Sequence, residues 1–496
     1  MRREETPLGI AQRAISGTLH VAFSSYAVQT IDFFRSLVLA RLLIPEYFGV
    51  LSLATFYLYF FGIIHSWGFN FALIHRKEKL EQAFAGHFLL TTTMAVLTFL
   101  VVFVSSPLIL VKFSPHLLEQ PQNYHDVVMV IRILAFLGIL QAIGGTPRIY
   151  LEKNLRFRAI AITEIVSTIL STLVALGFAW CQPNLYALLI WRISASLLPS
   201  VFVWFISPWR LSLKTDMATI KWFFRYGATM LPSAPLTLFF LKFDDYLAGT
   251  LCGLMALGLY AKAYSFSLIP LQFISSIVSR VAGPTYAKLQ NDRQELSKAF
   301  AYTTRNIVRV SGLFALILPS VATEFVLIVL GDQWLGLVPI LRILFVYAWL
   351  RPLINEFGVL YTAVGRPKYV LIEMASMMPM IVGGGFYLTS QFGLNGLAVS
   401  VDMMVLQGTV VGCFLCKRIV DVQFIKLLAP SALAAGFSFL TLVLYSSASL
   451  VVNPYANFFI KLGIVSLAYI FIIHLLEKKE LKFDVKYLLE ISRARC

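Results

Sequence analysis

The chain has 496 residues, of which 58% are hydrophobic and 13% are charged, and its mean hydropathy is +0.78. This composition indicates a polytopic membrane protein and leaves no room for a sizeable soluble domain. The formal net charge of +16 raises nucleic acid as a partner, but the basic residues lie in short flanks beside apolar segments. Lipid headgroups explain that placement better, so no nucleic-acid partner is expected.

Fourteen apolar segments follow one another along the chain, each long enough to cross a hydrocarbon core of about 30 Å as a helix. We therefore predict an all-α integral membrane protein with about fourteen transmembrane helices, and twelve is the alternative count. The predicted spans are 16–41, 47–74, 86–111, 126–147, 159–181, 184–206, 227–250, 256–286, 306–330, 336–364, 368–390, 393–416, 428–447 and 455–476.

Lys and Arg are concentrated in every second gap between these segments. The gaps on the other side hold only Arg41 and Lys112. Because short basic loops stay in the cytoplasm, both termini are expected on the cytoplasmic side. No removable signal peptide is expected, and the first helix is predicted to serve as the targeting signal.

An internal duplication recurs at an offset of about 210 residues. Ile131-Arg132-Ile133-Leu134 is repeated as Leu341-Arg342-Ile343-Leu344, and Phe48-Gly49-Val50 as Leu257-Gly258-Leu259. Each copy holds six helices, so the two lobes share one orientation and are related by a pseudo-twofold axis along the membrane normal. The predicted parts are an N-terminal lobe, a C-terminal lobe, two additional helices and a basic cytoplasmic tail, at 1–209, 210–420, 421–477 and 478–496.

Two charge pairs lie within predicted spans. Asp32 and Arg35 are three residues apart, as are Lys242 and Asp245, so each pair shares a helical face. The duplication aligns the two pairs with their signs exchanged. Intramembrane charges usually face a bundle interior, so one hypothesis is that Asp32 approaches Lys242 across a cleft between the lobes. The alternatives are that each pair neutralises itself within its own helix, or that the cations reach the outer interface.

Other charges in the spans are candidates for a cavity, for ion coupling or for gating. Arg351 lies near the middle of its predicted helix, five residues before Glu356. Glu164 and Glu373 occupy equivalent places near the cytoplasmic ends of their helices, where they take part in gating or meet the basic flanks.

Three further intramembrane charges, Arg192, Lys262 and Asp402, are assigned to packing or to hydration of the lumen. Cys413 and Cys416 are expected to pack in the core.

Catalytic motifs are not found. The chain has no phosphate-binding glycine loop ending in Gly-Lys-Ser/Thr, and its seven His have no metal-ligand spacing. Asp244-Asp245 is similar to the acidic motif of a sugar-nucleotide transferase, but it lies in a membrane span without a catalytic domain. No enzyme activity, cofactor or metal is expected, and Asp244 and Asp245 are kept as coupling candidates.

Six motifs spread over the two lobes carry a family resemblance: Ala40-Arg41-Leu42-Leu43, Pro45-Glu46-Tyr47-Phe48-Gly49, Ala72-Leu73-Ile74-His75-Arg76-Lys77, Asp245-Tyr246-Leu247-Ala248-Gly249, Leu257-Gly258-Leu259-Tyr260 and Pro284-Thr285-Tyr286-Ala287-Lys288-Leu289. Through them the chain resembles the polysaccharide transporter family of the multidrug/oligosaccharidyl-lipid/polysaccharide exporter superfamily, which has the fold of the drug antiporters. The chain departs from the family where Ser66 stands in place of an acidic residue before Trp67-Gly68.

The resemblance implies a flippase for oligosaccharide repeat units linked to undecaprenyl pyrophosphate, working by alternating access in the bacterial inner membrane. Arg35, Lys242 and Arg351 are then candidates for binding the pyrophosphate, because cations in a low-dielectric cleft suit that group. Asp32, Asp245 and the other acids are candidates for a coupling cation. Membrane lipids, a polymerase and chain-length or export proteins of the same pathway are the expected partners. A drug/cation antiporter of the same superfamily and a membrane polysaccharide polymerase are the alternatives.

Overall fold

The computed structural model describes residues 7–66, 68–113, 115–119, 121–228, 242–447, 453–478 and 480. Within these residues every regular element is a helix, which confirms the predicted all-α class. The chain divides into two compact units, Met1–Gly258 and Leu259–Cys496. The lobe boundaries that the duplication suggests, near residues 209 and 420, stay predictions, and the tail that follows residue 480 lies outside the described residues.

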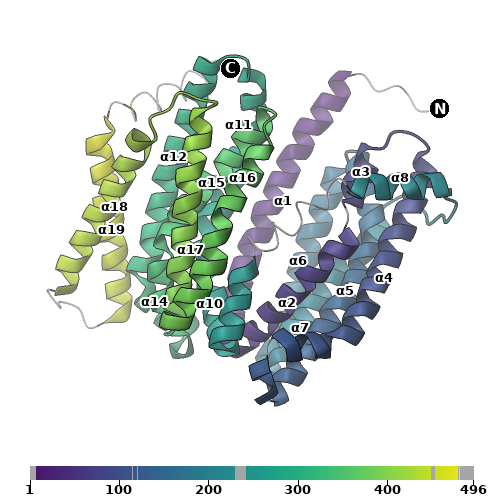
Figure 1. Cartoon of the computed structure of the whole chain (residues 1–496), viewed down its shortest axis with the longest axis horizontal. Coiled ribbons are helices and arrows are strands. Elements are labelled where there is room, and N and C mark those ends of the chain that lie inside the picture. The colour runs from purple at the N-terminus through teal and green to yellow at the C-terminus, as the bar shows by residue number, and fades with distance from the viewer. Residues whose placement is uncertain are drawn as a thin grey trace. The chain divides into compact units, whose positions relative to one another are not determined.

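The first unit contains long helices and two short ones, α3 and α8, that lie beside one end of α4 (Figure 1). Its elements are α1 (Pro7–Leu42), α2 (Pro45–Ser66), α3 (Phe69–His75), α4 (Leu80–Phe113), η1 (Pro115–Glu119), α5 (Pro121–Lys153), α6 (Phe157–Cys181), α7 (Leu185–Ile206), α8 (Met217–Ala228), a helical stretch at 242–247 and η2 (Ala248–Cys252).

The second unit begins within α10 and has more interrupted helices than the first. Its elements are α10 (Leu254–Ser267), η3 (Leu271–Ser275), α11 (Ser276–Leu289), α12 (Arg293–Ser320), α13 (Ala322–Phe325), η4 (Val326–Leu330), η5 (Asp332–Trp334), α14 (Leu337–Ile343), α15 (Phe345–Ala363), α16 (Lys368–Pro379), η6 (Met380–Gly384), α17 (Gly385–Lys417), α18 (Phe424–Ser447) and α19 (Pro454–Leu476).

Within the described ranges, eight helices are long and apolar enough to cross a membrane, or ten if each of two bent helix pairs is one span. The bends are 67° after α12 and 48° between α14 and α15. A further break falls at Gly393 (φ 60°, ψ −141°) inside α17, at the first residue of the predicted span 393–416. Without it, Lys368–Lys417 would be about 75 Å long, more than twice the hydrocarbon thickness. The chain is thus a multi-pass membrane protein, and the count of fourteen stays a prediction compatible with these spans.

Two repeat-equivalent glycines meet where α2 crosses the start of α10. A Cβ atom on Gly49 would lie 1.8 Å from the carbonyl oxygen of Leu254, and one on Gly258 would lie 1.8 Å from the carbonyl oxygen of Pro45. Both members of each equivalent pair, Pro45 with Leu254 and Gly49 with Gly258, are 209 positions apart. This reciprocal contact is what a parallel duplication predicts. The backbones approach so closely that only a residue without a side chain fits.

We expect Gly49→Ala to destabilise the protein by about 1–3 kcal/mol, because the new methyl group must push the two backbones apart. Gly177→Ala in α6 is the matched control, since a Cβ there meets no atom within 4 Å. Thermal unfolding of the purified protein in detergent measures both. Once one alanine has separated the helices the second has less to displace, so Gly49→Ala with Gly258→Ala should cost less than the sum of the single changes. Strictly additive losses of stability would contradict a direct contact between Gly49 of α2 and Gly258 of α10.

Candidate functional site

Arg35 of α1 is held by three neighbouring groups in the first unit. Its Nη1 lies 2.7 Å from Asp32 Oδ1 and 3.3 Å from Thr172 Oγ1 of α6. Its guanidinium lies over the Trp191 ring, 4.3 Å from the centroid. The Arg35 side chain is 6% exposed and that of Asp32 is 44% exposed, so Arg35 points among the helices and does not reach towards water.

Arg192 of α7 lies beside this pair. Its guanidinium is 4.8 Å from the Trp191 centroid, on the same ring that Arg35 contacts. Asp32, Arg35 and Tyr59 are all within electrostatic range of it. The Nε of Arg192 is buried and has no hydrogen-bond partner among the described residues. An unsatisfied charged donor inside a membrane protein indicates a site that a ligand or water completes.

Lys242 extends the positive charge towards Tyr59. Its Nζ lies 2.8 Å from Asp245 Oδ2 and 5.9 Å from the Tyr59 centroid. Asp244 is also within electrostatic range of Lys242, and both aspartates are 4% exposed. We refer to Arg35, Arg192 and Lys242 as the cationic cluster.

A cavity of about 340 Å³ opens beside the cationic cluster, between α2, α4, α5 and α7. Besides apolar groups, it is lined by a set of polar side chains: Thr55, Tyr59, Thr98, Gln141, Arg192 and Ser196. Gln141 Nε2 donates to Ser196 Oγ at 3.1 Å, while Thr98 Oγ1 has no partner in the described part of the chain. The cavity volume is near the lower end of the range for ligand pockets, which is about 300–1,000 Å³. The lining suits a ligand that carries hydroxyl groups and negative charge.

The structure shows the within-helix alternative for both predicted charge pairs. Asp32 pairs with Arg35, and Lys242 pairs with Asp245. Tyr59, Trp191 and Arg192 connect the two pairs through the contacts above, all inside the first unit. Arg351, the third predicted cation, is half-buried in α15 of the second unit.

The sequence analysis assigned Arg192 to packing or to hydration of the lumen and did not name it as a binding residue. One signal was available, because Arg192 is the single charged residue in the predicted span 184–206. A lone intramembrane charge is a functional-site hypothesis by default.

Glu356 of α15 and Glu373 of α16 form the core of a second polar group, in the second unit. Their residues are 1% and 3% exposed. Tyr286 of α11 donates to Glu356 Oε1, whereas Glu356 Oε2 and Glu373 Oε1 have no hydrogen-bond partner among the described residues. Arg351 is the charge within electrostatic range of Glu373.

Gly412 and Cys416 of α17 complete this second polar group. A Cβ on Gly412 would lie 2.8 Å from Glu373 Oε1, so glycine leaves room for that carboxyl. The Tyr361 hydroxyl donates to the Gly412 carbonyl oxygen at 3.1 Å and accepts a hydrogen bond from the Cys416 thiol at 3.5 Å. We call Tyr286, Glu356, Tyr361, Glu373 and Cys416 the buried acid cluster. Over the described residues, no group of three or more His, Cys, Asp or Glu is arranged to hold a metal ion.

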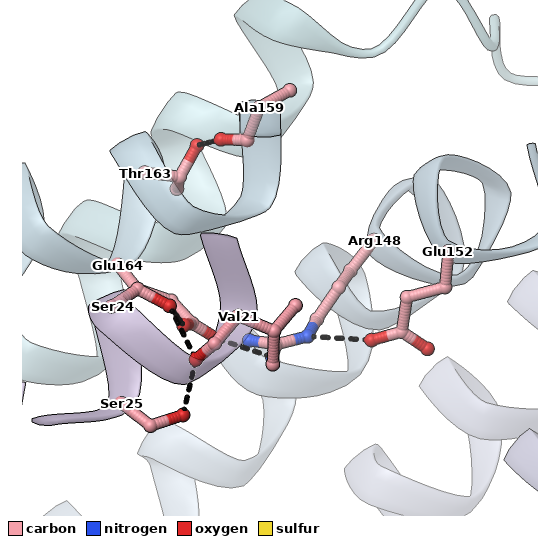
Figure 2. A network of polar contacts seen from close by, with 8 residues as sticks. All are labelled: Val21, Ser24, Ser25, Arg148, Glu152, Ala159, Thr163 and Glu164. Atoms are coloured by element: carbon pink, nitrogen blue, oxygen red, sulfur yellow. Dashed lines mark hydrogen bonds and ion pairs between the residues drawn. The ribbon is translucent and has the colours of Figure 1, made fainter. Parts of the chain in front are cut away.

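Glu164 meets the basic flank, as one of its two predicted alternatives required. Arg148 Nη2 lies 2.6 Å from Glu164 Oε1, and Arg148 Nε lies 3.1 Å from Glu152 Oε1. Ser24 Oγ of α1 lies 3.4 Å from Glu164 Oε2. Figure 2 shows Arg148 lying between the two glutamates, with Ser24 on the far side of Glu164. These contacts connect α1, α5 and α6 beside a cavity of about 320 Å³.

Comparison with known proteins gives one family and several relatives. Residues 38–339 match the family model described as polysaccharide biosynthesis protein. The teichuronic acid biosynthesis protein TuaB of Bacillus subtilis (strain 168) is 31% identical over 315 residues, 62% of each chain. The lipopolysaccharide biosynthesis protein WzxC of Escherichia coli (strain K12) is 23% identical over 385 residues, 76% of each chain. The match with TuaB thus spans less than two thirds of that relative.

Two solved structures share the fold at low sequence identity. The lipid II flippase MurJ, in an inward closed conformation, aligns with a TM-score of 0.70 at 15% identity, over 94% of this chain and all of MurJ. An inward-facing multidrug resistance MATE family transporter of the MOP superfamily aligns with a TM-score of 0.59 at 14% identity, over 80% of this chain and 98% of the transporter. Because the family model covers more than half of the sequence, this chain belongs to the polysaccharide biosynthesis protein family.

Proposed function

We propose that this protein is a flippase that moves an oligosaccharide repeat unit, linked to undecaprenyl pyrophosphate, from the inner to the outer leaflet of the bacterial cytoplasmic membrane. The observation that carries the proposal is the polar cavity beside the cationic cluster, where the Arg192 guanidinium retains an unsatisfied donor. The family and the names of the relatives, which belong to teichuronic acid and lipopolysaccharide biosynthesis, support it. Both termini are cytoplasmic in this proposal.

The pyrophosphate is the part of the substrate that the cationic cluster suits. Arginine offers a planar pair of donors to phosphate oxygens, and a lysine adds a point charge. Arg192 provides the first contact, because Arg35 and Lys242 are already paired with aspartates. Gln141, Ser196 and Thr55 line the same cavity and offer hydrogen bonds to sugar hydroxyls.

The buried acid cluster is the proposed site of the coupling ion, with Asp32, Asp244 and Asp245 as further candidates. Two carboxyl groups without an ion pair among the described residues are costly within a membrane unless each binds a proton or a cation. Binding there and release in another state would couple the ion to alternating access. The Arg148 contacts with Glu152 and Glu164 are the proposed gating element at the basic end of the first unit.

A drug/cation antiporter is the second candidate, since a MATE transporter shares the fold. Arg192 beside the cavity disfavours it, because a cationic drug would be repelled at that wall. A polymerase is disfavoured by the short predicted outer gap at 112–125. No catalytic role is proposed for any residue. A polymerase and chain-length or export proteins are proposed as partners in the same pathway.

A strain that lacks the gene should lose a surface or secreted polysaccharide and accumulate its lipid-linked repeat unit on the cytoplasmic face. Extraction of lipid-linked oligosaccharides, combined with their accessibility to a periplasmic glycosidase, measures both. If the unit reaches the periplasmic face without being polymerised, the protein acts as a polymerase or with one. Unchanged polysaccharide together with new drug sensitivity would instead support the antiporter.

Arg192→Gln should weaken substrate binding by about 1.5–3 kcal/mol, or roughly 10- to 150-fold, because a charge-assisted hydrogen bond to phosphate is lost. Arg132→Gln is the matched control, since Arg132 stacks on Phe103 at 4.3 Å and donates to the Phe103 carbonyl oxygen at 3.2 Å. Export is measured at equal protein level in the membrane. Equal defects in both variants would indicate general damage, and normal export by Arg192→Gln would place the headgroup site elsewhere.

Glu373→Gln and Glu356→Gln should fold normally, because an amide has the shape of a neutral carboxyl, and should abolish stimulation of transport by an ion gradient. Proteoliposomes with an imposed proton or sodium gradient provide the measurement, and the gradient that stimulates the unchanged protein identifies the ion. Glu295→Gln is the control, because Glu295 is an exposed residue paired with Lys298 at 2.7 Å. Stimulation that persists in both glutamine variants would exclude the buried acid cluster as the coupling site.

A further inference from the structure

Helix α8 is an amphipathic helix that crosses no membrane. It has 12 residues, too few for a span, and it lies beside α3 at one end of α4 (Figure 1). Thr219, Phe223 and Gly227, spaced by one helical turn, form its buried face. The Phe223 ring meets the Phe69 ring edge to face, with centroids 6.2 Å apart.

A close contact with α4 fixes the start of α8. A Cβ on Gly86 would lie 2.8 Å from Thr215 Oγ1 and 3.2 Å from Thr219 Cγ2, so α4 approaches without a side chain in between. Arg76 Nη2 also donates to Thr219 Oγ1 at 3.2 Å, and its guanidinium covers the Trp222 ring at 4.6 Å. One face of α8 therefore packs against other residues of the first unit.

Asp216 is the single acidic residue of segment 208–228, and both of its carboxylate oxygens have partners within the first unit. The Thr219 amide donates to its Oδ1 at 2.8 Å, and Lys79 Nζ lies 3.2 Å from its Oδ2. Hydrogen bonds from Thr219, and then from Lys79, lower the pKa of Asp216 from 3.8 to about 2. A lowered folded-state pKa stabilises the fold above the ordinary value and loses that effect as the pH falls towards 2. At neutral pH the carboxylate stays engaged in holding α8.

The exposed side chains of this segment are basic and apolar. Its exposed basic residues are Arg210, Lys214, Lys221 and Arg225. Its exposed apolar side chains are Leu211, Leu213 and Met217, which are 51%, 63% and 64% exposed. The segment contains no acidic residue besides Asp216, which is already bonded to Thr219 and Lys79.

Three tryptophans in or next to residues 208–228 indicate the depth of this segment in the membrane. Trp204 and Trp209 lie with ring centroids 5.4 Å apart, and Trp222 packs at the edge of the same apolar cluster that holds Phe69, Phe84 and Phe223. Tryptophan is enriched where a membrane protein meets the headgroup level. The exposed leucines next to basic residues are then at the boundary between acyl chains and headgroups, the usual position of an interfacial amphipathic helix.

We propose that residues 208–228 form a docking surface for anionic phospholipid headgroups of the leaflet at the basic side of the membrane. The four cations bind the headgroups, while Leu211, Leu213 and Met217 insert between the acyl chains. A soluble acidic partner would satisfy the cations but would leave no reason for exposed leucines beside them. The proposal does not depend on what the protein transports.

Hydrogen exchange of the full-length protein in lipid nanodiscs tests this proposal. The discs contain phosphatidylcholine alone, or phosphatidylcholine with about a third of phosphatidylglycerol. The variant carries Arg210→Gln, Lys214→Gln, Lys221→Gln and Arg225→Gln. The matched control removes four exposed basic residues of the second unit, with Arg366→Gln, Lys368→Gln, Lys417→Gln and Arg418→Gln.

Amides of residues 208–228 should exchange at least tenfold more slowly with phosphatidylglycerol, because each basic residue near the surface adds to the attraction. The protection should disappear in the variant with four glutamines in residues 208–228 and persist in the control. Leu211→Ser with Leu213→Ser should also reduce it, with all charges retained. Equal exchange in both discs, or equal losses in both charge variants, would overturn the proposal. Protection by inorganic phosphate in pure phosphatidylcholine discs would also overturn it, by showing an ion site in place of a lipid surface.

Discussion

The cost of burying an ionised side chain in a low-dielectric interior governs where the charges of this protein lie. Most deep charges of the described helices are neutralised locally. Lys461 pairs with Glu324 at 2.6 Å, Arg309 pairs with Glu477, and Arg35 pairs with Asp32. Against this background, Arg192, Glu356 and Glu373 are exceptions, because among the described residues each has an unsatisfied polar atom and no ion pair. Their local contacts do not neutralise their charge, which is why they identify the candidate sites.

The same constraint explains how the two helices outside the predicted repeat are attached. Arg309 of α12 binds Glu477, just beyond the end of α19, and Glu324 of α13 accepts from Lys461 and Asn457 near the other end of α19. Between them, the Tyr469 hydroxyl lies 2.6 Å from Ser431 Oγ of α18. Apolar contact with a neighbouring helix is little better than contact with lipid. Polar links at both ends therefore determine the register of α19 against the rest of the second unit.

The apolar segments and the charge alternation between them were enough to predict an all-α, multi-pass membrane protein, because crossing a hydrocarbon core fixes the length and composition of each helix. They were not enough for α8, whose 12 residues are too short for a span and whose end overlaps the predicted segment 227–250. The bends after α12 and before α15 were missed because they leave the apolar composition unchanged. For the charges, a spacing of three residues allowed Asp32 to be satisfied by Arg35 or by a distant lysine. The three-dimensional structure distinguishes those alternatives, because it pairs Asp32 with Arg35.

The pairing of the cationic cluster affects how a flippase of the proposed kind would work. A site made of three free cations would attract a pyrophosphate more strongly than one whose cations are paired, and tighter binding slows release. Here Arg35 and Lys242 each have an aspartate at 2.7–2.8 Å, so a phosphate that recruits either cation must weaken an existing pair. The net gain is the difference between two similar attractions, and Arg192 alone adds its full contribution. Because a change of a few kcal/mol is sufficient to reverse such a balance, small shifts of α1 or α7 between access states would be enough to load or empty the site.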